Sequence, residues 1–213
     1  MENVKNNMEK YFSYKTQIKK YNRAMQEGFY YEAILISYAI MEDRLMTILE
    51  NIGFVIMSKT DETKKFVVSE KVRPFMRSLI NEKKPNIQNI SVKRKLIESI
   101  LILTYEQAEQ YEKEYAEKQK TTEMNGYLQE LYMDIDESVI DRSKAIEMLK
   151  KQEEWCERRN KLIHSLLNIQ IDESFDEDVK TLAKESLTIW RYFDNDLAAK
   201  LKNCKLREKY HIE

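Results

Sequence analysis

The sequence predicts an all-α fold, an up-and-down bundle of about seven helices. Glycine and proline together number five among 213 residues, whereas average usage of roughly 7% and 5% would give about 25, so folds rich in tight turns are excluded. Apolar residues recur at intervals of three and four, the period of an α-helix. A hydrophobic content of 42% is enough for a real core. We therefore expect a single helical domain over residues 1–213, with a mobile tail over 204–213.

The first half of the chain contains two clear helices. Apolar residues from Val4 to Met25 follow the helical period and stop before Gly28, a residue typical of helix ends. A second amphipathic stripe runs over residues 29–50 and ends close to Gly53. These segments form the first two predicted helices.

The next apolar run, residues 54–57, has the composition of a short strand. Polar residues 58–65 follow it and we identify no partner run, so we expect a loop packed on the bundle and almost no strand. A shorter helix is expected from near Ser69, with Pro74 tolerated in its first turn, and it ends before Pro85.

Ser91 can cap a fourth helix that continues into a polar stretch over residues 106–120. We expect a short helix between Gly126 and the acidic residues 134–136. The two strongest helices follow, at about 138–168 and 173–202, and a tight connection should make them antiparallel. No internal repeat interrupts the series.

Charge and composition exclude several classes of function. The net charge is −1, from 36 basic and 37 acidic residues, so any attraction to nucleic acid must come from a local patch. The three glycines are too far apart for a phosphate-binding loop, and we expect no cofactor. Two cysteines, Cys156 and Cys204, are too few for a disulfide framework, and the longest apolar runs fall short of the roughly 20 residues that span a membrane. We expect a cytoplasmic protein without a membrane anchor.

The penultimate predicted helix carries the best candidate site. Asn160 and His164 are four residues apart and therefore lie on one face of the helix. Arg158, Arg159 and Lys161 surround the same histidine. This is the local basic patch that the net charge does not reveal. Cations near a helix C-terminus also stabilise the helix dipole, so the patch alone does not establish a function.

The run from Arg159 to His164 reads R-N-K-L-I-H, which matches the R-N-x-x-x-H form of the R-x4-6-H motif, and in this it resembles the HEPN superfamily. Residues 28–34 and 41–45 are similar to the opening helices of bacterial HEPN proteins of the abortive-infection kind. The resemblance implies a HEPN-like bundle and a metal-independent endoribonuclease. It also implies a homodimer whose two motifs meet in one cleft, acting as a toxin or antiviral defence effector under an inhibitory antitoxin or regulatory RNA.

The chemistry of metal-free RNA cleavage agrees with a dimer. The 2′-hydroxyl attacks phosphorus, so a base must take its proton, an acid must protonate the leaving oxygen, and cations must stabilise the phosphorane. Histidine suits both proton transfers because its ordinary pKa is near 6.5. The chain has only His164 and His211, and His211 lies close to the C-terminus. A twofold dimer would supply two copies of His164.

We assign the roles as hypotheses. His164 is the acid and base, Arg159 stabilises the phosphorane, and Asn160 orients the histidine ring or holds a phosphate oxygen. Arg158 and Lys161 bind RNA, and no residue is assigned to a metal. Spacing alone leaves open whether Arg158 or Arg159 is the motif arginine. The family branch paired with nucleotidyltransferase antitoxins has a tyrosine two residues after the histidine, where this chain has Leu166.

Glu42, Asp43 and Arg44 could support the site from the second helix or form a surface ion pair, and the sequence leaves this open.

Two other enzyme classes find little support. A di-metal bundle needs Glu-x-x-His pairs, and Lys161 occupies the required position before His164. Cys156 lies two turns before His164 within the apolar seam of the helix and reads as core rather than as a nucleophile. The serious alternative to a ribonuclease is a non-catalytic helical module that binds RNA or protein.

Overall fold

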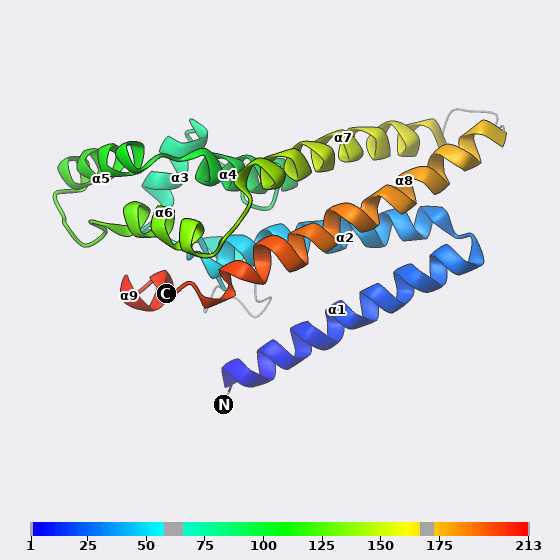
Figure 1. The fold of residues 1–213 in the computed structure, drawn as a ribbon, viewed down its shortest axis with the longest axis horizontal. Coiled ribbons are helices and arrows are strands. Elements are labelled where there is room, and N and C mark those ends of the chain that lie inside the picture. The colour runs from blue at the N-terminus through cyan, green and yellow to red at the C-terminus, as the bar shows by residue number, and fades with distance from the viewer. Residues whose placement is uncertain (1, 58–65, 167–172, 213) are drawn as a thin grey trace. The chain divides into compact units, whose positions relative to one another are not determined.

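The computed structural model describes residues 2–57, 66–166 and 173–212. These residues are mostly helical, with eight α-helices of eight or more residues, one shorter α-helix and two three-residue strands, which confirms the all-α prediction. In chain order the elements are α1 (Glu2–Glu27), α2 (Tyr30–Asn51), β1 (Val55–Met57), β2 (Phe66–Val68), α3 (Arg73–Ile80), α4 (Ile90–Ile102), α5 (Tyr105–Gln119), α6 (Tyr127–Glu137), α7 (Arg142–Leu166), α8 (Glu173–Tyr192), a π-helical segment (Phe193–Ala198), a 3-10 turn (Lys200–Asn203) and α9 (Leu206–Lys209) (Figure 1). None of the helices in these ranges is long and apolar enough to cross a membrane.

The chain forms two compact units, each built from segments that are distant in sequence. Unit 1 combines Met1–Asp43 with Lys150–Tyr192, and unit 2 combines Arg44–Leu149 with Phe193–Glu213. The chain passes from one unit to the other within α2, within α7 and at the end of α8. All the predicted site residues on α7 belong to unit 1.

Helix α8 organises unit 1. Buried side chains from the other three helices hydrogen-bond to it: Tyr21 Oη of α1 to the Ala183 carbonyl (2.9 Å), Ser37 Oγ of α2 with Ser186 Oγ (2.7 Å), and Trp155 Nε1 of α7 to the Leu182 carbonyl (2.8 Å). Figure 1 shows that α7 and α8 run in opposite directions, as predicted. The expected tight connection between them lies outside the described residues. Trp155, 1% exposed, anchors α7 on α8 just before the site residues.

The ends of these two helices differ from the prediction. Helix α7 begins at Arg142 because Asp141 caps it, its carboxylate accepting a hydrogen bond from the Lys144 amide at 2.9 Å. Val139, between α6 and α7, has a positive φ of 54° that a helix cannot contain. At the other end α8 stops at Tyr192, where the backbone changes to π-helical geometry.

The predicted long helix over residues 91–120 is two helices. Asn89 caps α4 by accepting a hydrogen bond from the Ser91 amide, so Ser91 is inside the helix rather than at its cap. Thr104 then starts α5 with a capping box, in which Thr104 and Gln107 each accept a hydrogen bond from the other's amide. The Thr-x-x-Gln signature was present in the sequence and marks this break.

The predicted loop over residues 54–57 is wrong, because Val55–Met57 is a strand. It pairs antiparallel with Phe66–Val68, and Ile56 lies opposite Val67. The partner run is three residues long and is separated from the first by the polar stretch 58–65, so it was not identified as a strand.

The C-terminal segment packs on unit 2 rather than forming the mobile tail expected over 204–213. Leu206, Tyr210 and Ile212 are at most 7% exposed. Tyr210 Oη donates a hydrogen bond to Glu130 Oε1 of α6 at 2.8 Å. Burial raises the pKa of the Tyr210 hydroxyl well above its ordinary value, and the Glu130 carboxylate raises it further.

Unit 2 is stabilised by a buried carboxylate at the start of α6. Glu112 of α5 is 4% exposed and accepts hydrogen bonds from the amides of Gly126 (2.8 Å), Leu128 (2.6 Å) and Gln129 (3.1 Å). Glu112→Ala would leave these amides without an acceptor, so it should lower the free energy of unfolding by about 2–4 kcal/mol. Urea unfolding would measure the loss. Glu109→Ala on the same helix removes only a surface pair with Lys113 and should cost at most about 0.5 kcal/mol; equal losses in the two variants would contradict the capping role.

Candidate active site

The predicted site residues lie in the last turns of α7. Arg158, Asn160, Lys161 and His164 are exposed to solvent, whereas Arg159 is half-buried against α2. The five residues therefore have different surroundings although they are close in sequence.

Arg159 is held in place by two contacts within unit 1. Its guanidinium carbon lies 4.1 Å from the centre of the Tyr38 ring of α2, a cation–π distance. Its Nη1 donates a hydrogen bond to Asn160 Oδ1 at 2.9 Å. Its Nε atom is buried and has no hydrogen-bond partner among the described residues. A guanidinium held in a fixed orientation is suited to bind an oxyanion.

Arg158 and Arg159 differ in their contacts, although their spacing from His164 does not distinguish them. Arg158 Nη1 forms an ion pair with Glu185 Oε2 of α8 at 2.6 Å, with both side chains nearly half exposed. No carboxylate in the described part of the chain lies within ion-pair distance of Arg159. Within the described residues the charge of Arg158 is balanced by a neighbouring carboxylate and that of Arg159 is not.

Tyr38 is a site residue that sequence reasoning missed. Burial raises the pKa of its hydroxyl, and the negative charge of Glu42 raises it further, while Arg159 lowers it. The phenol is therefore neutral at physiological pH and offers Arg159 the electron-rich face of its ring. The only signal in the sequence was an aromatic residue one helical turn before Glu42.

Asn160 contacts the neighbouring arginine. We expected Asn160 to orient the His164 ring or to hold a phosphate oxygen, and in the described residues its side-chain oxygen accepts a hydrogen bond from Arg159 Nη1 at 2.9 Å. His164 lies one turn further along α7, in the last turn of the helix, where its imidazole is accessible from solvent.

Arg44 forms an ion pair that was not considered from the sequence. Arg44 is 9% exposed, and its Nη1 donates to Asp194 Oδ1 at 2.8 Å within unit 2. The pair is partly buried, since the Asp194 side chain is 28% exposed. Glu42 is half-buried and influences Tyr38 electrostatically.

In the residues that the structure describes, no group of three or more His, Cys, Asp or Glu side chains is arranged to hold a metal ion. Comparisons with protein-family models, with curated proteins and with solved structures return no match for this chain.

Proposed function

We propose that the chain is a metal-independent endoribonuclease that cleaves single-stranded RNA and leaves a 2′,3′-cyclic phosphate, acting as a toxin or antiviral defence effector. The observation that carries this proposal is Arg159, a half-buried guanidinium with no carboxylate partner in the described residues, held by Tyr38 and Asn160 on the same helix as the solvent-accessible His164. The HEPN-like motif supplies the reaction class.

The proposed reaction needs no water in its first step. A neutral His164 takes the proton of the 2′-hydroxyl, and the 2′-oxygen attacks phosphorus to form the phosphorane. The bond to the 5′-oxygen then breaks, and a protonated histidine donates the proton that this oxygen needs. Arg159 stabilises the negative charge on the non-bridging oxygens, which is largest in the transition state.

The two proton transfers lead to the proposal of a homodimer. His164 is the one histidine of the chain on α7 with Arg159, and a single imidazole is poorly placed to act on both sides of the phosphorus. His164 of the partner subunit would provide the second group, and an isologous interface would bring the two copies together by symmetry.

The neighbouring cations would guide RNA to the site. Lys161 is exposed, and Arg158 can exchange its surface pair with Glu185 for a phosphate at a cost of about 0–1 kcal/mol. An antitoxin protein or a regulatory RNA that covers His164 would inhibit the enzyme.

A non-catalytic interaction module is the alternative, and two exposed apolar residues favour it. Phe29 is 56% and Leu35 is 54% exposed at the start of α2. Apolar side chains exposed in this way occur at protein interaction surfaces. Measured RNA cleavage decides between the two functions.

The purified chain is expected to cleave a fluorescently labelled single-stranded RNA in EDTA at the rate seen in Mg²⁺. The internal 2′-hydroxyl mechanism requires a 2′,3′-cyclic phosphate on the upstream product, which mass spectrometry identifies. A metal-activated water would instead leave a plain phosphate and lose activity in EDTA.

The matched control substrate carries a single 2′-deoxyribose at each mapped cleavage position, which removes the nucleophile and should abolish cleavage there. Cleavage of this substrate, or loss of all activity in EDTA, contradicts the proposed mechanism. No cleavage of any RNA leaves the interaction module as the function.

A further inference from the structure

A local excess of positive charge lies outside the candidate active site. Between Glu70 and Lys95 there are eight lysines and arginines and two glutamates, a net charge of +6 in a chain whose total is −1. This segment contains α3, the loop that follows it and the start of α4, all within unit 2. Lys93 and Arg94 are at most 5% exposed, and Lys71 and Lys95 pair with Glu123 and Glu82. The charge that can attract a polyanion therefore lies on the remaining cations of α3 and the loop.

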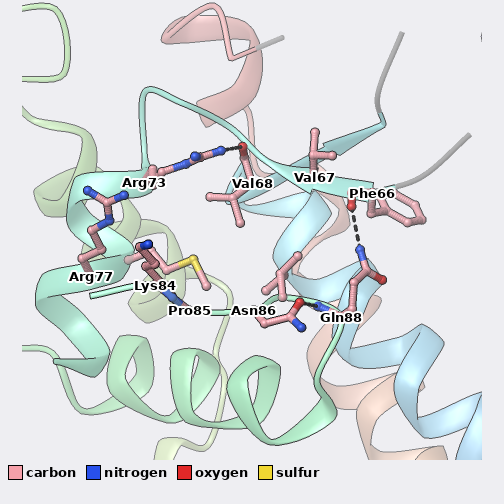
Figure 2. A pocket seen from close by; sticks show the side chains of 11 residues that line it. Phe66, Val67, Val68, Arg73, Arg77, Lys84, Pro85, Asn86 and Gln88 are labelled. Atoms are coloured by element: carbon pink, nitrogen blue, oxygen red, sulfur yellow. Dashed lines mark hydrogen bonds between the residues drawn. The ribbon is translucent and has the colours of Figure 1, made fainter. Parts of the chain in front are cut away.

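A cavity of about 510 Å³ opens in this segment, between strand β2, helix α3 and the loop before α4. Figure 2 shows the side chains that line it, with Arg73 and Arg77 on α3, Lys84 on the loop, and Asn86 and Gln88 towards β2. No acidic residue is among the described residues that line it. The volume is in the range of small-molecule sites, about 300–1,000 Å³.

Two of the cations are available for a ligand. Arg77 and Lys84 are exposed, and no described carboxylate forms an ion pair with either of them. Arg73 is partly occupied, because its Nη2 lies 2.7 Å from Glu70 Oε1 and also donates weakly to the Val68 carbonyl at 3.4 Å.

The wall opposite these cations is held by hydrogen bonds. Gln88 Nε2 donates to the Phe66 carbonyl at 2.9 Å, and the Gln88 amide donates to Asn86 Oδ1 at 3.0 Å (Figure 2). The loop is thereby tied to the outer edge of β2. A wall that is ordered before binding lowers the entropy cost of binding a ligand.

We propose that this pocket binds phosphate groups of single-stranded RNA, with Arg77 and Lys84 as the phosphate contacts. Lys83, next to Lys84, is also exposed and forms no ion pair with a described carboxylate. Three such cations are more than one isolated phosphate would need, and this favours a polynucleotide over a free nucleotide. The site uses no residue of the candidate active site, so RNA binding here does not depend on the proposed cleavage reaction.

The test measures binding of a 5′-fluorescein-labelled 12-nucleotide oligouridine by fluorescence anisotropy, in a His164→Asn background that prevents turnover. Arg77→Gln combined with Lys84→Gln should raise Kd at least about tenfold. It should also reduce the slope of log K against log salt concentration by about 1.4, because each lost contact to a single strand contributes about 0.7.

The matched control combines Lys113→Gln with Lys118→Gln. These two lysines are also in unit 2, and their side chains are each 69% exposed. Replacing both of them removes the same charge from α5. A general loss of charge would weaken RNA binding equally in both double variants, and that result would overturn the proposal.

Adenosine monophosphate distinguishes the source of the phosphate. If calorimetry shows that it binds in a manner dependent on Arg77 and Lys84, while oligouridine binding does not depend on them, the pocket takes free nucleotides and the assignment to RNA is wrong. The background variant keeps the two proposals separate, since loss of cleavage leaves RNA binding by this pocket measurable.

Discussion

The His164→Asn variant is expected to cleave RNA at least about 10²-fold more slowly than the unaltered chain, since general acid–base catalysis contributes roughly 10²–10⁴-fold. Asparagine has nearly the shape of the imidazole but cannot transfer protons at neutral pH. The side chain is exposed at the end of α7, so the fold should be unaffected. Single-turnover cleavage of a labelled RNA gives the rate, and the thermal midpoint checks the fold.

His211→Asn is the matched control, because His211 is the only other histidine in the sequence. It is exposed and has a φ of 48°, a left-handed conformation that asparagine tolerates. This variant should cleave at the unaltered rate. Equal loss in the two variants would remove His164 from the mechanism. A chain that light scattering shows to be monomeric, yet whose cleavage depends on His164, would contradict the proposed second histidine from a partner subunit.

Arg159→Ala is expected to lower the cleavage rate by about 10²–10³-fold while changing the affinity for RNA much less. The reason is that Arg159 is fixed before substrate binds, and a preorganised donor contributes most when charge develops on the phosphorane. The measurement is kcat and KM on the same RNA. Arg159→Lys should recover part of kcat, because it keeps the charge but cannot reproduce the bidentate hydrogen bonding.

Arg158→Ala, one residue away, is the control for charge. It removes a surface ion pair with Glu185, so it should leave kcat within a few-fold, weaken RNA binding modestly and make it less dependent on salt. If Arg158→Ala abolishes turnover while Arg159→Ala spares it, the assignment of the motif arginine is reversed.

Local signals in the sequence were enough to predict most of the helices. Glycine placement predicts that α1 ends just before Gly28. Helical periodicity predicts α7 and α8 as two successive helices. Both signals are carried by residues that are close in sequence. The break at Thr104 was missed because apolar periodicity continued past it, although the capping box was readable. The hairpin between β1 and β2 needed a pairing across the segment 58–65, and three-residue strands carry little pattern of their own.

The candidate site, too, was predicted where local sequence was sufficient and missed where distant segments meet. The motif placed Arg159, Asn160 and His164 on one helix, but helical spacing could not decide which arginine is balanced by a carboxylate. That depends on Glu185, which comes from α8. Tyr38 could not be predicted as the partner of Arg159 because the two residues meet only through the packing of α2 against α7. The partners of Arg158 and Arg159 come from other helices, and the residue pattern of a single helix does not reveal them.

Because unit 1 is formed by two distant segments, it cannot assemble early in the synthesis of the chain. Met1–Asp43 leaves the ribosome first, but its partners in Lys150–Tyr192 follow only after more than a hundred further residues. At about 5–20 residues per second, this delay lasts roughly 5–20 s. During that time Tyr38 has no Arg159 to hold, and Tyr21 has no Ala183 carbonyl to donate to. The proposed site therefore cannot assemble in a nascent chain before residues 150–192 have been translated.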